Sequence, residues 1–278
     1  MKRRVDLLSI VLRLLMVAAA ALTALIILFL VGYILLKGIP HLTPGLFAWT
    51  YTSANVSLTP ALINTVLVTL LALALATPLG IFSAIYLGEY AKRGNRLVKL
   101  IRVAAEALSG IPSIVYGLFG MLFFVVTLGW GYSLLAGTCT LAIMILPLIM
   151  RTTEEALLAV PDTYREGSFG LGAGRLRTVF AIVLPAAIPG ILAGIILAIG
   201  RIVGETAALI FTAGTLAKVP GSVMDSARTL SVHMYSLSSE GLYVDQAYAT
   251  AVVLLVLVVL INALSAFAAK KMMGGRHG

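Results

Sequence analysis

The long uncharged stretches of this sequence are what most restrict how the chain can fold. Leu14 to Leu36 and Ala61 to Gly88 contain no Asp, Glu, Lys or Arg, and Ala107 to Met150 stays uncharged for 44 residues. A helix needs about 20 apolar residues to cross the hydrocarbon core of a bilayer, so these stretches predict membrane-spanning helices. Only 11% of the residues are charged, against about 25% in soluble domains, which excludes a water-soluble enzyme and a disordered chain.

These stretches, together with two later apolar segments, predict six membrane-spanning helices. The 44-residue stretch is too long for one crossing, and a tight turn at Gly129-Trp130-Gly131-Tyr132 is predicted to divide it into two helices. The fifth helix is expected from about Pro189 to Ala213 and the sixth from Ala247 to Ala269. The fold class is therefore all-α, a polytopic membrane protein. The N-terminal run exceeds the roughly 7–15 apolar residues of a signal peptide, so we expect a retained helix.

The distribution of basic residues predicts the orientation of these helices. Lys and Arg are enriched in the short loops on the cytoplasmic side of membrane proteins. With both termini placed inside, 16 of the 20 basic residues fall on the cytoplasmic side, so the net charge of +9 reports topology and does not indicate nucleic-acid binding. The 16 are Lys2, Arg3, Arg4, Arg13, Lys92, Arg93, Arg96, Lys99, Arg102, Arg151, Arg165, Arg175, Arg177, Lys270, Lys271 and Arg276.

Two charged residues, Arg201 and Glu205, lie inside the predicted fifth helix. A charge near the middle of a bilayer costs about 2.5–3.5 kcal/mol on insertion scales, so such residues usually face a bundle interior or an aqueous path. At spacing i, i+4 the two side chains share one helix face and can pair. At about 100° per residue, small residues share that face. They are Gly190, Gly194, Ala198 and Ala208.

Three interpretations of this face remain open. In the first, the ion pair only locks helix packing, and Gly190 and Gly194 allow a close approach between helices. In the second, the face lines a translocation path in which Arg201 meets a polar or anionic solute, and Glu205 orients and compensates the guanidinium. In the third, Glu205 carries protons. Thr206 follows directly and offers a hydroxyl to the same path, although it lies about 100° away from Glu205 around the helix.

The predicted inner loop between the fourth and fifth helices is expected to contain a short helix of two or three turns. Pro161 and Asp162 are favourable at a helix start, and Gly170, Gly172 and Gly174 are favourable at a helix end. This polar helix would lie on the cytoplasmic side, outside the hydrocarbon.

The residues of this loop also carry a family resemblance. Glu166-Gly-Ser, three residues, Gly172, nine residues and then Ile182-Val-Leu-Pro185 resembles the EAA signature of ABC importer permeases, in which Glu-Ala-Ala, Gly and Ile-x-Leu-Pro stand at the same spacing. The departure is Gly167 and Ser168 in place of two alanines. Both are small, so a close approach to a partner surface is retained.

The resemblance implies the type I importer permease fold and a loop that docks on separate ATPase subunits. The docking residues would be Tyr164, Arg165, Glu166, Gly167, Ser168 and Gly172. The sequence contains no Gly-x-x-x-x-Gly-Lys-[Ser/Thr], the phosphate loop with which such ATPases bind nucleotide. We therefore expect a transport subunit that is not itself an enzyme and holds no cofactor, with ATP bound by the partner.

Two further segments resemble the phosphate-specific branch of these permeases, the PstA family. They are Arg201-Ile-Val-Gly-Glu-Thr-Ala207 and Pro112-Ser-Ile-Val-Tyr-Gly-Leu118. The resemblance implies that Arg201 and Glu205 take part in phosphate passage. It also implies a heterodimer with a homologous permease subunit and an extracytoplasmic phosphate-binding protein. A permease for another oxyanion, such as sulfate or molybdate, an ion-coupled transporter that uses Glu205, and a scaffold remain alternatives.

The predicted organisation has three parts. Residues 1–60 form an N-terminal helix and an external loop, residues 61–269 form the permease domain, and residues 270–278 form a cytoplasmic tail. Within the second external loop, Asp225 to Glu240 is expected to form a surface helix capped by Asp225, with His233 solvated or at an interface. The single cysteine, Cys139, excludes a disulfide framework and a cysteine metal site.

Overall fold

The computed structural model describes residues 7–92 and 94–274, and all regular elements within them are helical. The α-helices are α1 (Leu7–Gly38), α2 (Thr59–Ile85), α3 (Arg96–Ser109), α4 (Ser113–Gly120), α5 (Leu134–Leu158), α6 (Asp162–Gly170), α7 (Arg175–Thr178), α8 (Leu184–Val203), α9 (Ala207–Ile210), α10 (Leu230–Glu240) and α11 (Val244–Gly274). Lys2, Arg3, Arg4, Arg93 and Arg276, which enter the orientation prediction, lie outside the described residues.

Short helices of other pitch join several of these elements. The 3₁₀ helices η1 (Ile39–His41) and η2 (Pro44–Phe47) follow α1. Three π-helical segments continue α2, continue α4 and lead into α8. They are η3 (Tyr86–Tyr90), η4 (Met121–Thr127) and η5 (Val179–Val183).

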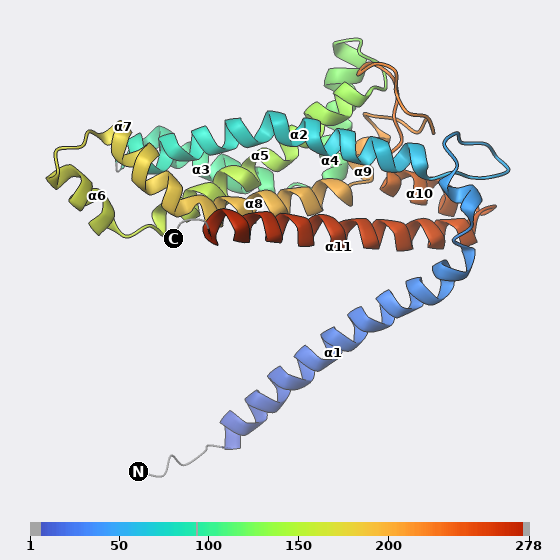
Figure 1. Cartoon of the computed structure of the whole chain (residues 1–278), viewed down its shortest axis with the longest axis horizontal. Coiled ribbons are helices and arrows are strands. Elements are labelled where there is room, and N and C mark those ends of the chain that lie inside the picture. Colours follow the sequence, from blue (N-terminus) through green and yellow to red (C-terminus); the bar gives the residue numbers. More distant parts are fainter. Residues whose placement is uncertain (1–6, 93, 275–278) are drawn as a thin grey trace.

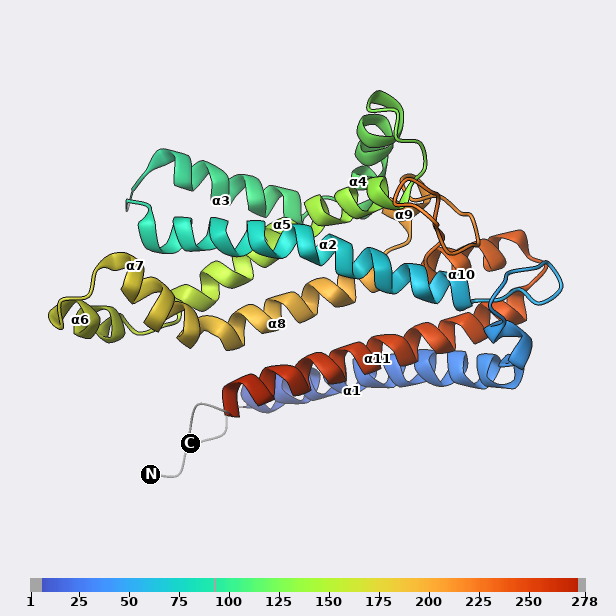
Figure 2. The same ribbon diagram turned by 45° about the horizontal axis from the view of Figure 1, so that its top comes forward.

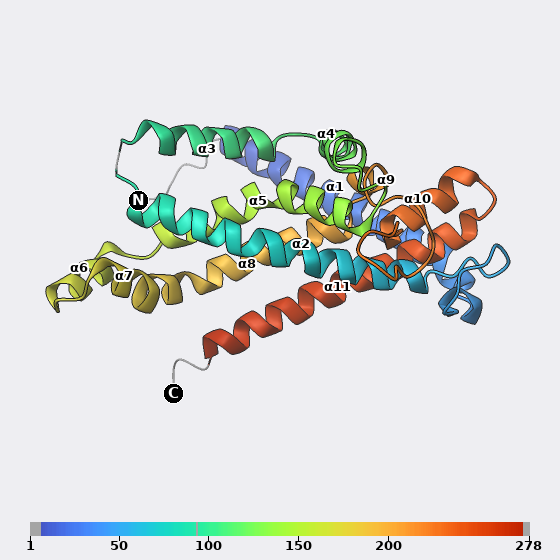
Figure 3. The same ribbon diagram turned by 90° about the horizontal axis from the view of Figure 1, so that it is seen from above.

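Helices α2, α5 and α8 form the centre of the molecule, with α3 and α11 on opposite sides of them (Figures 2 and 3). Helix α1 diverges from this bundle and meets α11 at one end (Figure 1). At that end Gly38 lies so close to α11 that a β-carbon would stand 2.5 Å from Cγ2 of Val252. The chain-terminal ends of α1 and α11 point toward the side of the molecule on which α6 lies (Figure 2).

The prediction of six crossings agrees with the structure if one bent pair of helices counts as a single span. Five helical segments of the described chain are long and apolar enough to cross a bilayer, and α3 with α4 and η4 makes a sixth if this bent pair is one span. The two parts meet at 101°. The bend falls at Pro112, which has no backbone N–H to donate and keeps an extended ψ of 141°.

One predicted loop and the predicted tail contain more helix than expected. Helix α3 begins at Arg96, so Arg96, Lys99 and Arg102 lie on a helix and not in a loop, and Glu154 of α5 pairs with Arg102. The expected turn between the third and fourth crossings is confirmed, because η4 ends at Thr127 and α5 begins at Leu134. Helix α11 continues to Gly274, into the segment predicted as a tail.

The helix in the second external loop was predicted with the wrong start and environment. Helix α10 begins at Leu230, and Asp225 instead accepts hydrogen bonds from the backbone of Gly221 and Ser222. Its central residues are buried, including His233, which is 0% exposed. The reason is that α10 packs on α11 and α2 and closes this end of the bundle.

Candidate functional site

The short helix predicted in the inner loop is present as α6, and its ends are formed by the predicted residues. Pro161 occupies the N-cap position with an extended ψ of 139°, and Asp162 lies in the first turn. The helix ends at Gly170, after which Gly172 adopts φ +82°, a left-handed conformation that glycine reaches without strain. The local signals at both ends are therefore sufficient to specify this helix.

The outer face of α6 and of the turn after it exposes several large apolar and aromatic side chains. Tyr164 is 52% exposed, Phe169 48% and Leu171 91%. Glu166 lies among them and is exposed, and a β-carbon added at Gly167 would meet no atom within 4 Å. A projecting helix of this kind is typical of a surface that another protein covers.

Two of the predicted docking residues face the other way. Ser168 is 4% exposed, and its hydroxyl lies 2.8 Å from the hydroxyl of Thr178. Arg165 points toward α2 and α5 and donates hydrogen bonds to the carbonyls of Leu157 and Val160 at 2.9 and 2.8 Å. Ser168 therefore holds α6 to the following segment and does not belong to the exposed face of α6.

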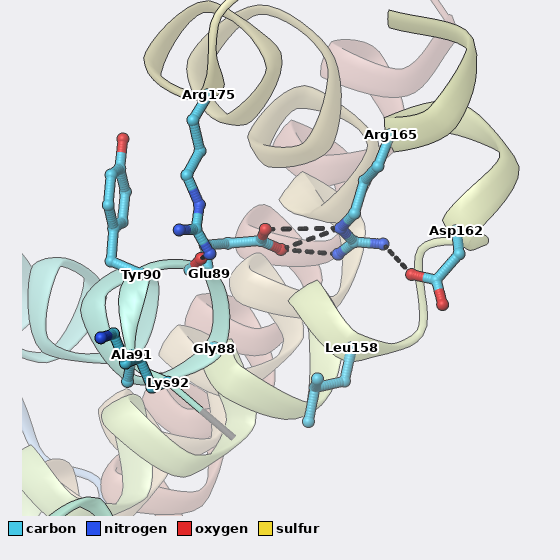
Figure 4. A pocket seen from close by; sticks show the side chains of 9 residues that line it. All are labelled: Gly88, Glu89, Tyr90, Ala91, Lys92, Leu158, Asp162, Arg165 and Arg175. Carbon is cyan, nitrogen blue, oxygen red and sulfur yellow. Dashed lines mark hydrogen bonds and ion pairs between the residues drawn. The ribbon is translucent and has the colours of Figure 1, made fainter. Parts of the chain in front are cut away.

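Arg165 is held mainly by Glu89, which lies in η3 at the end of α2 (Figure 4). The guanidinium Nη2 lies 2.6 Å from Oε1 of Glu89, and Asp162 lies 3.2 Å from Nη1 on the opposite side. The hydrogen bond to Glu89 raises the pKa of the Arg165 guanidinium above its ordinary value. The arginine therefore remains charged and paired.

A cavity of about 460 Å³ opens beside this pair. Its lining combines the end of α2 with residues of α5, α6 and α7, and Arg175 places its guanidinium 5.2 Å from the ring centre of Tyr90 (Figure 4). Arg175 also donates a hydrogen bond to the backbone carbonyl of Glu89. Glu89 was not among the predicted site residues, and its only signal in the sequence is that it ends a long uncharged run.

The second predicted site, around Arg201 and Glu205, has a different geometry from the one expected. Helix α8 ends at Val203, so the two residues do not share a continuous helix, and within the described chain neither has an ion-pair partner. Glu205 is 8% exposed and accepts a hydrogen bond from the backbone N–H of Ala208 at 3.0 Å. It thereby caps the short helix α9. Arg201 is partly exposed.

Two glycines of α8 lie close to another helix. A β-carbon at Gly190 would lie 2.6 Å from that of Ala156, and one at Gly194 would lie 2.0 Å from Oγ1 of Thr152. Both neighbours belong to α5. The close-approach interpretation therefore fits Gly190 and Gly194, although Gly190 is also exposed beside a cavity, and the translocation interpretation of this face stays a prediction. Thr206 is partly exposed at the break between α8 and α9.

Among the described residues no group of three or more His, Cys, Asp or Glu side chains is arranged to hold a metal ion. Cys139 is a free, partly buried thiol on α5.

Comparison with known proteins places these features in a family. Residues 76–273 match the family model described as binding-protein-dependent transport system inner membrane component. The probable ABC transporter permease protein YqgI of Bacillus subtilis is 36% identical over 242 residues, which cover 81% of this chain and 82% of that protein. The phosphate transport system permease protein PstA 1 of Mycobacterium tuberculosis is 40% identical over 154 residues, which cover 55% of this chain and 50% of that protein.

Solved structures support the fold at lower identity. A chain of the MetNI methionine ABC transporter superimposes with a TM-score of 0.60 at 21% identity, covering 77% of this chain and 94% of that one. A chain of a bacterial ABC transporter that imports alginate gives a TM-score of 0.67 at 16% identity, covering 95% of this chain and 98% of that one.

Proposed function

The chain belongs to the family of binding-protein-dependent transport system inner membrane components, and from this premise we propose that it is the PstA-like permease subunit of an ATP-driven importer of inorganic phosphate. It is a multi-pass membrane protein and a transport component of the ABC importer type. Phosphate as the transported solute is the further step, supported by the relatives named PstA and by the chemistry of Arg201.

The observation that carries the phosphate assignment is the guanidinium of Arg201, which has no ion-pair partner among the residues that the structure describes. Helix α8 ends at Val203, well short of the bundle end that α2 and α11 reach (Figure 1), and Arg201 lies in its last turn. Glu205 is engaged in capping α9 and does not neutralise it. A guanidinium matches the oxygens of a phosphate in geometry and charge. Arg201, with the Thr206 hydroxyl nearby in the sequence, is therefore assigned to phosphate passage. Glu205 is assigned to stabilising the chain between α8 and α9.

The exposed face of α6 is the proposed contact for separate ATPase subunits. Tyr164, Glu166, Gly167 and the turn at Gly172 belong to this face, whereas Arg165 and Ser168 support it from behind. The α6 end is assigned to the cytoplasm because most of the basic residues flank the helices there. ATP is bound by the partner, and a homologous permease subunit and an extracytoplasmic phosphate-binding protein complete the proposed importer.

The proposal is tested by uptake of labelled phosphate into proteoliposomes that hold the whole importer with internal ATP. Arg201→Gln should reduce uptake by about two orders of magnitude, because loss of a charged hydrogen-bond donor at a binding site costs roughly 3 kcal/mol. The complex should still assemble. Normal uptake by this variant refutes the role of Arg201.

The alternatives give different results in the same vesicles. Uptake of sulfate or molybdate in preference to phosphate indicates another oxyanion importer. Uptake driven by a proton or sodium gradient without ATP indicates an ion-coupled transporter and refutes the proposal.

A further inference from the structure

Both ends of the docking loop, defined here as residues 162–178, are attached to one residue of η3, the segment that continues α2. Arg165 near the start of the loop donates from Nη2 and Nε to the Glu89 carboxylate, at 2.6 and 3.2 Å. Arg175 near its end donates to the Glu89 backbone carbonyl and covers the ring of Tyr90 (Figure 4). Glu89 therefore binds the loop through both its side chain and its main chain.

The contact between Arg165 and Glu89 is buried, so separating the two side chains is costly. The side chains of Arg165 and Glu89 are 15% and 9% exposed, whereas Asp162, which also pairs with Arg165, is 75% exposed. Exposed ion pairs contribute little, but separating a buried pair leaves uncompensated charges away from water. A displacement of α6 is therefore expected to move the end of α2 with it.

The opposite end of α2 is attached to residues 214–229, which we name the outer segment. Asn64 is 0% exposed and donates from Nδ2 to the carbonyls of Lys218 and Arg228, at 2.9 and 3.0 Å. Next to it, Thr65 accepts a hydrogen bond at 2.8 Å from the backbone N–H of Leu230, the first residue of α10. The same helix thus joins the docking loop at one end of the molecule to the outer segment at the other (Figure 1).

We propose that Glu89 is a positioning residue through which the docking loop moves α2, and that Asn64 transmits the displacement of α2 to the outer segment. This inference rests on the proposed function in one respect, since it takes the ATPase to bind α6. In this proposal, α2 couples nucleotide binding on one side of the membrane to movement of the outer segment on the other side.

The test follows a reporter in the outer segment of the assembled importer. Val223 is 47% exposed, and Val223→Cys in a Cys139→Ala background gives a single thiol whose labelling rate is measured with and without ATP. Glu89→Gln should shrink the ATP-dependent change in labelling about fivefold or more, the lower end of typical coupling between sites. The ATPase should still co-purify and hydrolyse ATP. Asp162→Asn, which removes the exposed partner of the same arginine, should leave the change intact.

A second variant tests the other end of α2. Asn64→Leu keeps the side-chain volume but removes both hydrogen bonds to the outer segment, and it should abolish the labelling change while ATPase binding is unaffected. The proposal is overturned if the Glu89→Gln variant retains the full labelling change. It is also overturned if the ATPase no longer binds to this variant, because Glu89 would then be needed for assembly. No phosphate is needed for this measurement, so a failure of phosphate uptake by the parent complex refutes the proposed function without deciding this inference.

Discussion

Replacement of Gly194 by alanine tests how tightly α8 packs on α5. The new β-carbon would lie 2.0 Å from Oγ1 and 2.7 Å from Cβ of Thr152, whereas carbon atoms in contact lie about 3.5–4.0 Å apart. The Thr152 hydroxyl cannot turn away freely because it donates a hydrogen bond to the carbonyl of Leu148 at 2.9 Å. The two helices must therefore separate by about 1 Å, and overpacking of this kind costs about 1–3 kcal/mol.

Gly200→Ala on the same helix is the matched control. A β-carbon at Gly200 would meet no atom within 4 Å. Both variants receive the same gain of about 1 kcal/mol in helix propensity, so this gain cancels when they are compared. We expect Gly194→Ala to have the lower free energy of unfolding, by about 1–3 kcal/mol. Denaturant unfolding in detergent micelles, followed by helix content, measures the difference. Equal stability of the two variants would refute the close packing described for α5 and α8.

Two further predictions concern opposite ends of the molecule. Burial, with a smaller effect from the Arg228 charge, lowers the pKa of His233 from 6.5 to about 4, so the unfolded chain binds more protons between these values. The neutral histidine then contributes about 3 kcal/mol to the free energy of unfolding, fully present above pH 6.5 and lost as the pH falls toward 4. Between these pH values the free energy of unfolding should change less steeply with pH in His233→Gln than in the parent. An unchanged slope would contradict the burial of His233. At the α6 end, Leu171→Glu replaces an apolar side chain that is 91% exposed by a charged one. It should weaken ATPase binding about tenfold in a pull-down titration. Binding as tight as in the parent would show that Leu171 is not part of the contact.

The helices that local signals specify could be predicted, and α6 is the best example. Proline and aspartate at its start and glycines at its end act within a few residues of the backbone they terminate. The uncharged runs located the membrane-spanning helices for a similar reason, because each helix has to satisfy its own backbone hydrogen bonds in the bilayer. The bend between α3 and α4 was missed because an uncharged run shows where a helix is apolar and not where its direction changes.

The errors at the predicted site arose because a helical repeat does not show which neighbouring helix a face packs against, or where the helix ends. Periodicity showed that Gly190 and Gly194 share a face, but not that Ala156 and Thr152 of α5 cover it. It also extended the fifth helix to about Ala213, whereas α8 ends at Val203 and the expected pairing of Arg201 with Glu205 is lost. Glu89 was missed because its partner Arg165 lies 76 positions away in the sequence.

The break between α8 and α9 has a consequence for hydration. Backbone that leaves the helical pattern at membrane depth is tolerated only where protein covers it or water reaches it. Gly204 is exposed although Val203 and Glu205 on either side are buried, so the described chain does not cover the backbone at this step and hydration is expected there. Backbone amides at the break should therefore exchange with deuterium faster than those in the middle of α8, and the most rapidly exchanging part of this span would lie beside Arg201.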